Sequence, residues 1–146
     1  MGRAVVAASC LAALSLTAGC SAAVRVQPPA PQGATAAACA SLDDRLPRTL
    51  DGAERVPSEP PSPYVAVWGS GEIALRCGVP RPAALDPTEQ VPEINGVPWY
   101  ADPARPSLFT ALVHGDYVEL TISSRHQAAA VLVDLAAPIK TAFPGH

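Results

Sequence analysis

The sequence predicts a small two-layer α+β domain in which an antiparallel sheet packs against an N-terminal and a C-terminal helix. Apolar residues recur at helical spacing near both ends of the folded part, over 36–46 and 128–143. Between them lie short alternating segments separated by Gly-, Pro- and Asn-containing turns, which indicate strands joined as hairpins. With 146 residues, the chain has room for one such core.

The N-terminus has the features of a secretory signal peptide over residues 1–19, with a positive start and an apolar run. The run is shorter than the roughly 20 residues of a transmembrane helix. It ends in Leu-Thr-Ala-Gly-Cys at 16–20, which resembles the lipobox of bacterial lipoproteins, although Thr17 stands where the strict pattern has Leu, Val or Ile. We expect acyl chains such as palmitate on Cys20 and a location at the extracytoplasmic face of the cell membrane. The alternative is cleavage at an ordinary signal-peptidase site, which would release a secreted protein.

Residues 20–35 are mostly small, polar or proline residues with few side chains to bury. This composition predicts a flexible, lipid-anchored tether. Such a tether would hold the folded part away from the membrane surface. The single α+β domain is then expected over residues 36–146.

Both predicted helices are bounded or interrupted by proline. The apolar pattern of 36–46 ends at Pro47, since proline cannot continue a helix. The pattern of 128–143 contains Pro138, which lacks an amide hydrogen and clashes with the preceding turn. We therefore expect a kink there, or a break into two short helices.

The strands are predicted from alternation and from turn residues. Segments 64–68 and 72–77 lie on either side of a Gly-Ser-Gly turn. Asn95-Gly96 between apolar residues predicts a tight turn with positive backbone angles. These segments place three or more strands in the middle of the chain.

The clearest hairpin is predicted over residues 108–123. A two-residue loop at Gly115-Asp116 places Val113 opposite Val118 and continues an apolar face. A loop one residue earlier would place Val113 opposite Asp116. The first register is preferred because it pairs apolar side chains.

Four cysteines are present, of which Cys10 would leave with the signal peptide and Cys20 would carry lipid. Cys39 and Cys77 remain, and an exported protein with two such cysteines is expected to join them in a disulfide. Cys39 lies on the apolar face of its helix, and Cys77 alternates with apolar residues along its strand. Both thiols should therefore face the core.

The other fate for these thiols, a metal site, needs His ligands at a workable spacing. His114, His126 and His146 form no such motif with either cysteine. Each histidine is expected to be solvated. Neither a metal ion nor another cofactor is expected.

Charge and motifs exclude several function classes. A formal net charge of -3 and a sequence pI of about 5.5 argue against a nucleic-acid partner, which would need a basic face. Gly-rich phosphate loops are absent, and the carboxylates are scattered rather than paired. The Gly-Ser-Gly turn lacks the spacing of a nucleophile elbow.

Four residues are candidates for ligand contact: Trp68, Asn95 and Trp99, which lie in or beside turns, and Arg76, which lies beside Cys77. Two tryptophans in a chain with few aromatic residues could line a groove for a peptide or glycan. The alternative is that they close the core of a small domain. Arg76 could bind an acidic ligand or pair with a nearby carboxylate.

Several stretches together resemble one family of exported actinobacterial proteins, catalogued as domain of unknown function 3515. The most specific are Leu-Arg-Cys-Gly-Val at 75–79 and Asn-Gly-Val-x-Trp at 95–99, where x is Pro98, and the resemblance spans about 39–138. Members of the family are mostly lipoproteins or secreted proteins, so the resemblance implies export. It implies no activity and no catalytic residues.

The leading hypothesis is a lipid-anchored accessory or binding module of the bacterial cell envelope, without catalytic activity. Its partners would be the membrane, through lipid on Cys20, and an envelope protein or glycan. The alternative is a small envelope hydrolase that uses His114 or His126 with a carboxylate. Turnover that depends on either histidine would distinguish the two.

Overall fold

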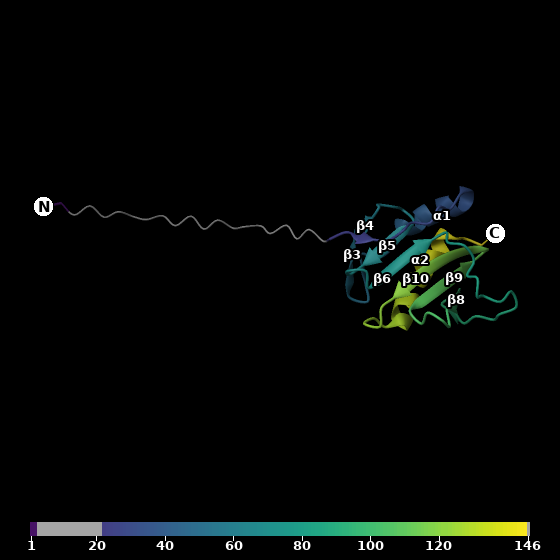
Figure 1. Ribbon diagram of the computed structural model, residues 1–146. Coiled ribbons are helices and arrows are strands. Elements are labelled where there is room, and N and C mark those ends of the chain that lie inside the picture. The colour runs from purple at the N-terminus through teal and green to yellow at the C-terminus, as the bar shows by residue number, and fades with distance from the viewer. Residues whose placement is uncertain (3–21, 146) are drawn as a thin grey trace.

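In the computed structural model, which describes residues 1–2 and 22–145, eight strands form one antiparallel sheet with both helices on the same side of it (Figure 1). The predicted α+β domain, with a helix near each end, is confirmed. The elements in chain order are β1 (Val24–Arg25), α1 (Gly33–Asp43), β2 (Thr49–Leu50), β3 (Ala53–Val56), β4 (Ser58–Glu59), β5 (Val65–Trp68), β6 (Ile73–Cys77), β7 (Glu93–Ile94), β8 (Val97–Ala101), β9 (Leu108–Val113), β10 (Asp116–Ile122) and α2 (Ala128–Ala142).

The sheet consists of two meanders joined side by side. Its strand order is β2-β3-β5-β6-β10-β9-β8-β7, so the long β6–β10 pairing joins the first meander to the second. Leu75 of β6 lies opposite Leu120 of β10, and both are buried. β1 and β4 form a separate two-stranded parallel sheet.

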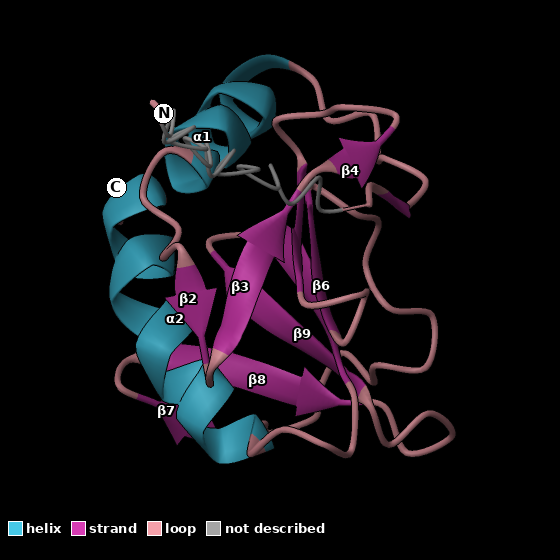
Figure 2. Ribbon diagram, turned by 90° about the vertical axis from the view of Figure 1, so that its left-hand side faces the viewer, coloured by secondary structure: helices cyan, strands magenta, loops and turns pink. Residues whose placement is uncertain are grey.

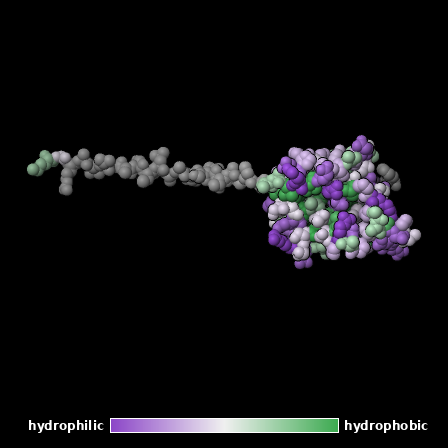
Figure 3. All heavy atoms as spheres, viewed as in Figure 1, coloured by the Kyte–Doolittle hydropathy of each residue, from purple (hydrophilic) through white to green (hydrophobic). Residues whose placement is uncertain are grey.

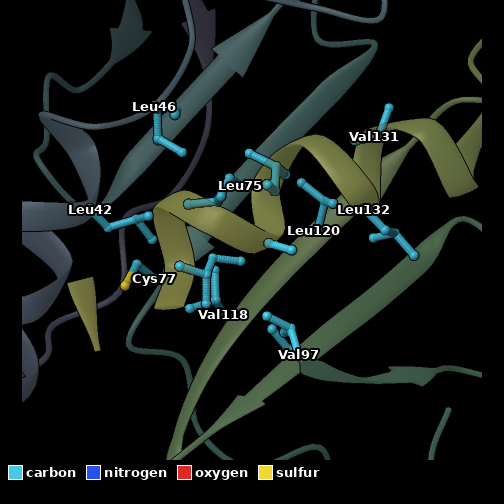
Figure 4. Close-up of a cluster of buried hydrophobic side chains, with 14 of the residues drawn as sticks. Leu42, Leu46, Leu75, Cys77, Val97, Val118, Leu120, Val131 and Leu132 are labelled. Atoms are coloured by element: carbon cyan, nitrogen blue, oxygen red, sulfur yellow. The ribbon is translucent and has the colours of Figure 1, made fainter. Parts of the chain in front are cut away.

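The core lies between one face of the sheet and the two helices (Figure 2). Alternation decides which side chains enter it: Ile73, Leu75 and Cys77 of β6 are buried, whereas the residues between them are half-buried. Figure 4 shows sheet and helix side chains meeting in this layer, including Leu42 of α1 and Leu132 of α2. We call the other side of the sheet, which Figure 1 shows in front, the outer face.

The predicted disulfide is present. Cys39 of α1 and Cys77 of β6 are bonded, and each is 1% exposed. α1 itself begins and ends three residues earlier than the sequence analysis expects. Its start lies in a run of alanines, the strongest helix formers. Its end follows from Pro47, which disfavours helical backbone at Leu46.

α2 is one continuous helix, so of the two outcomes expected at Pro138 the break into two short helices is wrong, and the kink stays a prediction. A helix tolerates an internal proline when tertiary packing offsets the lost backbone hydrogen bond. Leu135 and Ile139, on either side of Pro138, are both fully buried in the core. Their burial holds the helix together across the proline.

The predicted β9–β10 register is also wrong. The loop is His114-Gly115, and Val113 lies opposite Asp116. Both loop residues have positive φ, 51° and 92°, as a two-residue hairpin turn of the favoured hand requires. The turn geometry therefore outweighs the apolar cross-strand pairs. Since the two registers differ by two residues, each side chain keeps its predicted face, and Val118 remains in the core.

Residues 24–31, which we call the strap, pack against the domain where the sequence analysis expects a flexible tether. β1 pairs with β4, and the Gln27 carbonyl accepts a hydrogen bond from Arg76 Nε on the outer face, 3.0 Å away. The face of the domain seen in Figure 3 carries mainly hydrophilic side chains with hydrophobic ones between them. Within residues 22–145, contact with the domain thus begins at Val24.

The predicted signal peptide and the lipidation site at Cys20 lie outside the described residues, apart from residues 1–2. Within the described part of the chain, neither helix is long and apolar enough to span a membrane.

Candidate functional site

Three turns meet at one end of the sheet and bring four charged side chains together. Asp51 lies in the β2–β3 turn, Glu72 ends the β5–β6 turn, and Arg125 and His126 lie between β10 and α2. We call these four residues the His126 cluster. Antiparallel pairing explains the meeting, because turns that leave the same ends of neighbouring strands gather at one edge.

The imidazole of His126 lies between two carboxylates. Its Nδ1 is 3.1 Å from Asp51 Oδ2, and its Nε2 is 3.2 Å from Glu72 Oε2. The other oxygen of Glu72 accepts a hydrogen bond of 3.0 Å from Arg125 Nη1. The His126 side chain is 9% exposed, so the expectation that this histidine is solvated is wrong.

The backbone around the cluster is arranged to hold it. Asp51 has a positive φ of 45°, and its Oδ2 also accepts a 2.9 Å hydrogen bond from the amide of Gln127, the residue that precedes α2. A side chain at Gly69 would place its Cβ 2.5 Å from Glu72 Oε2. Glycine at that position therefore leaves the space in which the Glu72 carboxylate turns toward His126.

The charges of the cluster stabilise one another. Hydrogen bonding to Glu72 raises the pKa of His126 above its ordinary value of 6.5, which partial burial of the ring opposes and Asp51 reinforces. The Gln127 amide and then His126 lower the pKa of Asp51. His126 and then Arg125 lower the pKa of Glu72. The cluster therefore favours an imidazolium between two carboxylates.

This arrangement fits a structural link better than a catalytic base. A general base or a metal ligand needs a ring nitrogen with a free lone pair directed at its target. Both nitrogens of His126 face carboxylates, and the charged form donates from both. The cluster instead joins two turns of the sheet to the start of α2.

The two predicted groove residues, Trp68 and Trp99, are core residues. They are 0% and 1% exposed and lie in the layer between sheet and helices. Trp68 Nε1 donates a 3.0 Å hydrogen bond to the Pro47 carbonyl, and the Arg55 guanidinium lies 5.9 Å above its ring. The indole nitrogen of Trp99 has no hydrogen-bond partner among the residues that the structure describes.

The other two candidates for ligand contact lie elsewhere. Arg76 is on the outer face, where Nη1 donates to Glu119 over 2.9 Å and Nε donates to the strap. Asn95 lies exposed at the β7–β8 turn with a φ of 50°, which confirms the predicted tight turn. The structure does not bring the four candidates together in one groove.

His114 lies exposed in the β9–β10 turn, and no hydrogen bond or ion pair joins its ring to a described carboxylate. Of the two histidines of the hydrolase alternative, His126 is thus the one with carboxylate partners. Among the described residues, no group of three His, Cys, Asp or Glu side chains is placed to hold a metal ion.

Asp51, Glu72 and Arg125 are not among the site residues predicted from the sequence. These residues are separated along the chain by about 20 to 50 positions and form no motif. Glu72 and Arg125 border predicted strands, but the short strands β2 and β3 on either side of Asp51 were not predicted, so the three residues have no common signal in the sequence. Only the strand order shows that these loops share one end of the sheet.

A family model described as Protein of unknown function (DUF3515) matches residues 3–146, essentially the whole chain. The chain belongs to this family. No curated protein and no solved structure matches the chain significantly. The resemblance stated from the motifs at 75–79 and 95–99 is therefore confirmed. Both stretches lie within the folded domain. The first contains Arg76 and Cys77 of β6, and the second forms the β7–β8 turn and places Trp99 in the core.

We expect this DUF3515 domain to gain stability from the His126 cluster in a defined pH range. The stabilisation linked to the raised pKa of His126 is fully present below about pH 6.5. It is lost as the pH rises through the pKa that His126 has in the folded protein. The stabilisation linked to the lowered pKa of Glu72 is present above about pH 4.5. It is lost as the pH falls through the pKa that Glu72 has in the folded protein. Urea unfolding should therefore show greater stability at about pH 5.5 than at about pH 8.

The matched controls are His126→Gln and His114→Gln. His126→Gln should flatten this part of the pH profile, because a neutral amide cannot carry the charge. His114→Gln should leave the profile unchanged, since His114 lies exposed in a turn. An unaltered profile in His126→Gln would show that the cluster does not set the pH dependence.

Proposed function

We propose that this DUF3515 protein is a lipid-anchored, extracytoplasmic binding module of the bacterial cell envelope. The observation that carries the proposal is the Cys39–Cys77 disulfide, which joins α1 to the centre of the sheet. Disulfides persist in oxidising compartments outside the cytoplasm. The apolar N-terminal run and the lipobox-like residues before Cys20 agree with that location.

The hydrogen-bond partners of His126 and His114 support binding rather than catalysis. A small hydrolase would need a histidine with one nitrogen oriented by a carboxylate and the other directed at a nucleophile. Both nitrogens of His126 face carboxylates, and His114 has no described carboxylate partner. The partner is proposed to be an envelope protein or a glycan, in addition to the membrane that the acyl chains enter.

Replacement of Cys20 by Ala tests the anchor. Cells grown with an alkyne-bearing fatty acid should label the wild-type protein, and Cys20→Ala should lose the label because no thiol remains to carry acyl chains. The variant should also move from the membrane fraction to the medium, since two or more acyl chains are needed for stable anchoring. The measurements are in-gel fluorescence and fractionation.

Cys10→Ala is the matched control, because it removes a cysteine from the same N-terminal segment. It should keep both the label and the membrane location. An unlabelled wild-type protein, or equal labelling of Cys20→Ala, would overturn the lipoprotein proposal. Turnover of envelope peptides or glycans that is abolished by His126→Ala or His114→Ala would favour the hydrolase instead.

A further inference from the structure

The strap holds the N-terminal part of the chain to one end of the domain. The amide of Val24 donates to the Pro57 carbonyl over 2.9 Å, and the amide of Val26 donates to the Glu59 carbonyl over 3.0 Å. A side chain at Gly71, in the β5–β6 turn, would place its Cβ 3.2 Å from Val24 Cγ1. Val24 therefore lies beside β4 and the β5–β6 turn.

The strap is also fixed further along. Its Gln27 carbonyl accepts from Arg76, and Pro31 lies so close to Gly78 that a Cβ there would come within 2.6 Å of Pro31 Cβ. Gly71 lies just before the start of β6, and Gly78 directly follows its end. The strap thus runs along the length of the sheet, and it cannot swing away without breaking contacts at both ends.

We propose that the β4 and β5–β6 turn end of the domain lies directly against the lipid headgroups of the membrane. This inference rests on the proposed function, in which Cys20 carries the acyl chains. From Cys20 to Val24 there are four residue steps, which span at most about 14 Å when fully extended. A domain attached to β4 by so short a connection cannot stand clear of the bilayer.

The opposite end of the sheet then faces away from the membrane. The His114-Gly115 turn lies at the other end of β10 from the residues that pair with the start of β6. The seven residues of β10 extend over about 23 Å. In Figure 1 the long loop between β6 and β7 projects on the side of the domain opposite to the strap's start.

The chemistry of the near end suits a headgroup layer. A groove of about 550 Å³ opens beside β4, and its lining includes Arg48, Ser58 and Ser62. Glu54 also lines it and accepts a hydrogen bond from Thr49. The Ser58 hydroxyl already donates to the Pro60 carbonyl, whereas the Ser62 hydroxyl accepts from the Tyr64 amide and keeps its own proton. The Ser62 hydroxyl and the exposed Arg48 guanidinium can therefore donate to phosphate and glycerol oxygens.

This end of the domain is suited to resting on the headgroups rather than to insertion. Among the described residues, the exposed large hydrophobic side chains are Met1 and Val133, and Val133 lies on α2. Arg25 at the strap is paired with Glu59. The acyl chains would supply the attachment, and the polar surface would set the orientation.

Photocrosslinking in membranes tests this orientation. Benzoylphenylalanine is placed in the full-length chain at exposed Ser70, in the β5–β6 turn, or at exposed Ala83, in the loop after β6. Membranes that contain alkyne-bearing lipids are irradiated, and lipid adducts are measured in the protein band. We expect several-fold more adduct at position 70 than at position 83.

The matched control lengthens the connection without changing the domain. A flexible Gly-Ser insert of about 20 residues between Ser21 and Ala22 adds a mean span of about 25 Å. This insert should keep the protein in the membrane fraction and lower the adduct at position 70 to that at position 83. Equal adducts at the two positions in a membrane-bound protein without the insert would overturn the orientation. Absence of the protein from the membrane fraction would overturn the lipid anchor itself.

Discussion

Joint replacement of Cys39 and Cys77 by Ala is expected to lower the free energy of unfolding by about 4 kcal/mol. The disulfide closes a long loop, with a sequence separation of 38, and so restricts the unfolded chain. Folded domains of this kind have a total stability of about 5–15 kcal/mol, so the loss is a large part of it. Urea unfolding of the unlipidated protein, followed by tryptophan fluorescence, measures the change.

The reduced wild-type protein is the control for this experiment. A reductant should destabilise the wild-type protein to about the level of the double variant and should leave the double variant unchanged. Alanine is preferred to serine because both positions are 1% exposed and a buried hydroxyl would add a separate cost. Two labelled thiols at these positions in unreduced protein isolated from cells would contradict the disulfide.

Replacement of Trp68 or Trp99 by Ala is expected to cost about 3–5 kcal/mol each, as deletion of a large buried aromatic side chain does. Both indoles lie between the sheet and the helices, so neither site can refill with water at little cost. Chemical unfolding followed by circular dichroism measures the loss without relying on tryptophan fluorescence. A loss below about 1 kcal/mol at either position would place that indole at the surface and restore the groove hypothesis.

The two Trp→Phe variants separate packing from hydrogen bonding. Trp68→Phe removes the donor to the Pro47 carbonyl, whereas Trp99→Phe removes a nitrogen without a hydrogen-bond partner in the described part of the chain. We therefore expect Trp68→Phe to be the more destabilising of the two, because it leaves a carbonyl unpaired. Equal losses would show that the Trp68 hydrogen bond contributes little.

The parts of the fold that sequence predicted are those with a periodic signal. Alternation along β6 placed Cys77 in the core, and helical spacing placed Cys39 there, so the disulfide followed from two local patterns. The Asn95-Gly96 turn followed from residue type alone. Each of these features depends on residues that are close together in the chain.

The errors came where one local rule competed with another or with tertiary structure. In the β9–β10 hairpin, apolar pairing competed with turn geometry, and the positive φ values at His114 and Gly115 decided the register. At Pro138, the propensity to break a helix competed with the burial of Leu135 and Ile139, and burial decided.

The strap and the His126 cluster had no local signal at all. β1 is two residues long, and its pairing with β4 joins Val24 to Ser58 across a segment rich in proline. A contact of that kind cannot be derived from periodicity. The cluster likewise depends on strand order, which sets three turns side by side.

The two outermost strands of the sheet, β2 and β7, are each only two residues long. A long outer strand would present a row of unpaired amide and carbonyl groups to which another chain could add a strand. In this sheet the longer strands β6, β10 and β9 are all paired on both sides. Copies that the proposed lipid anchor would concentrate in the plane of a membrane would meet often. The two short outermost strands offer such copies few free backbone groups through which to aggregate.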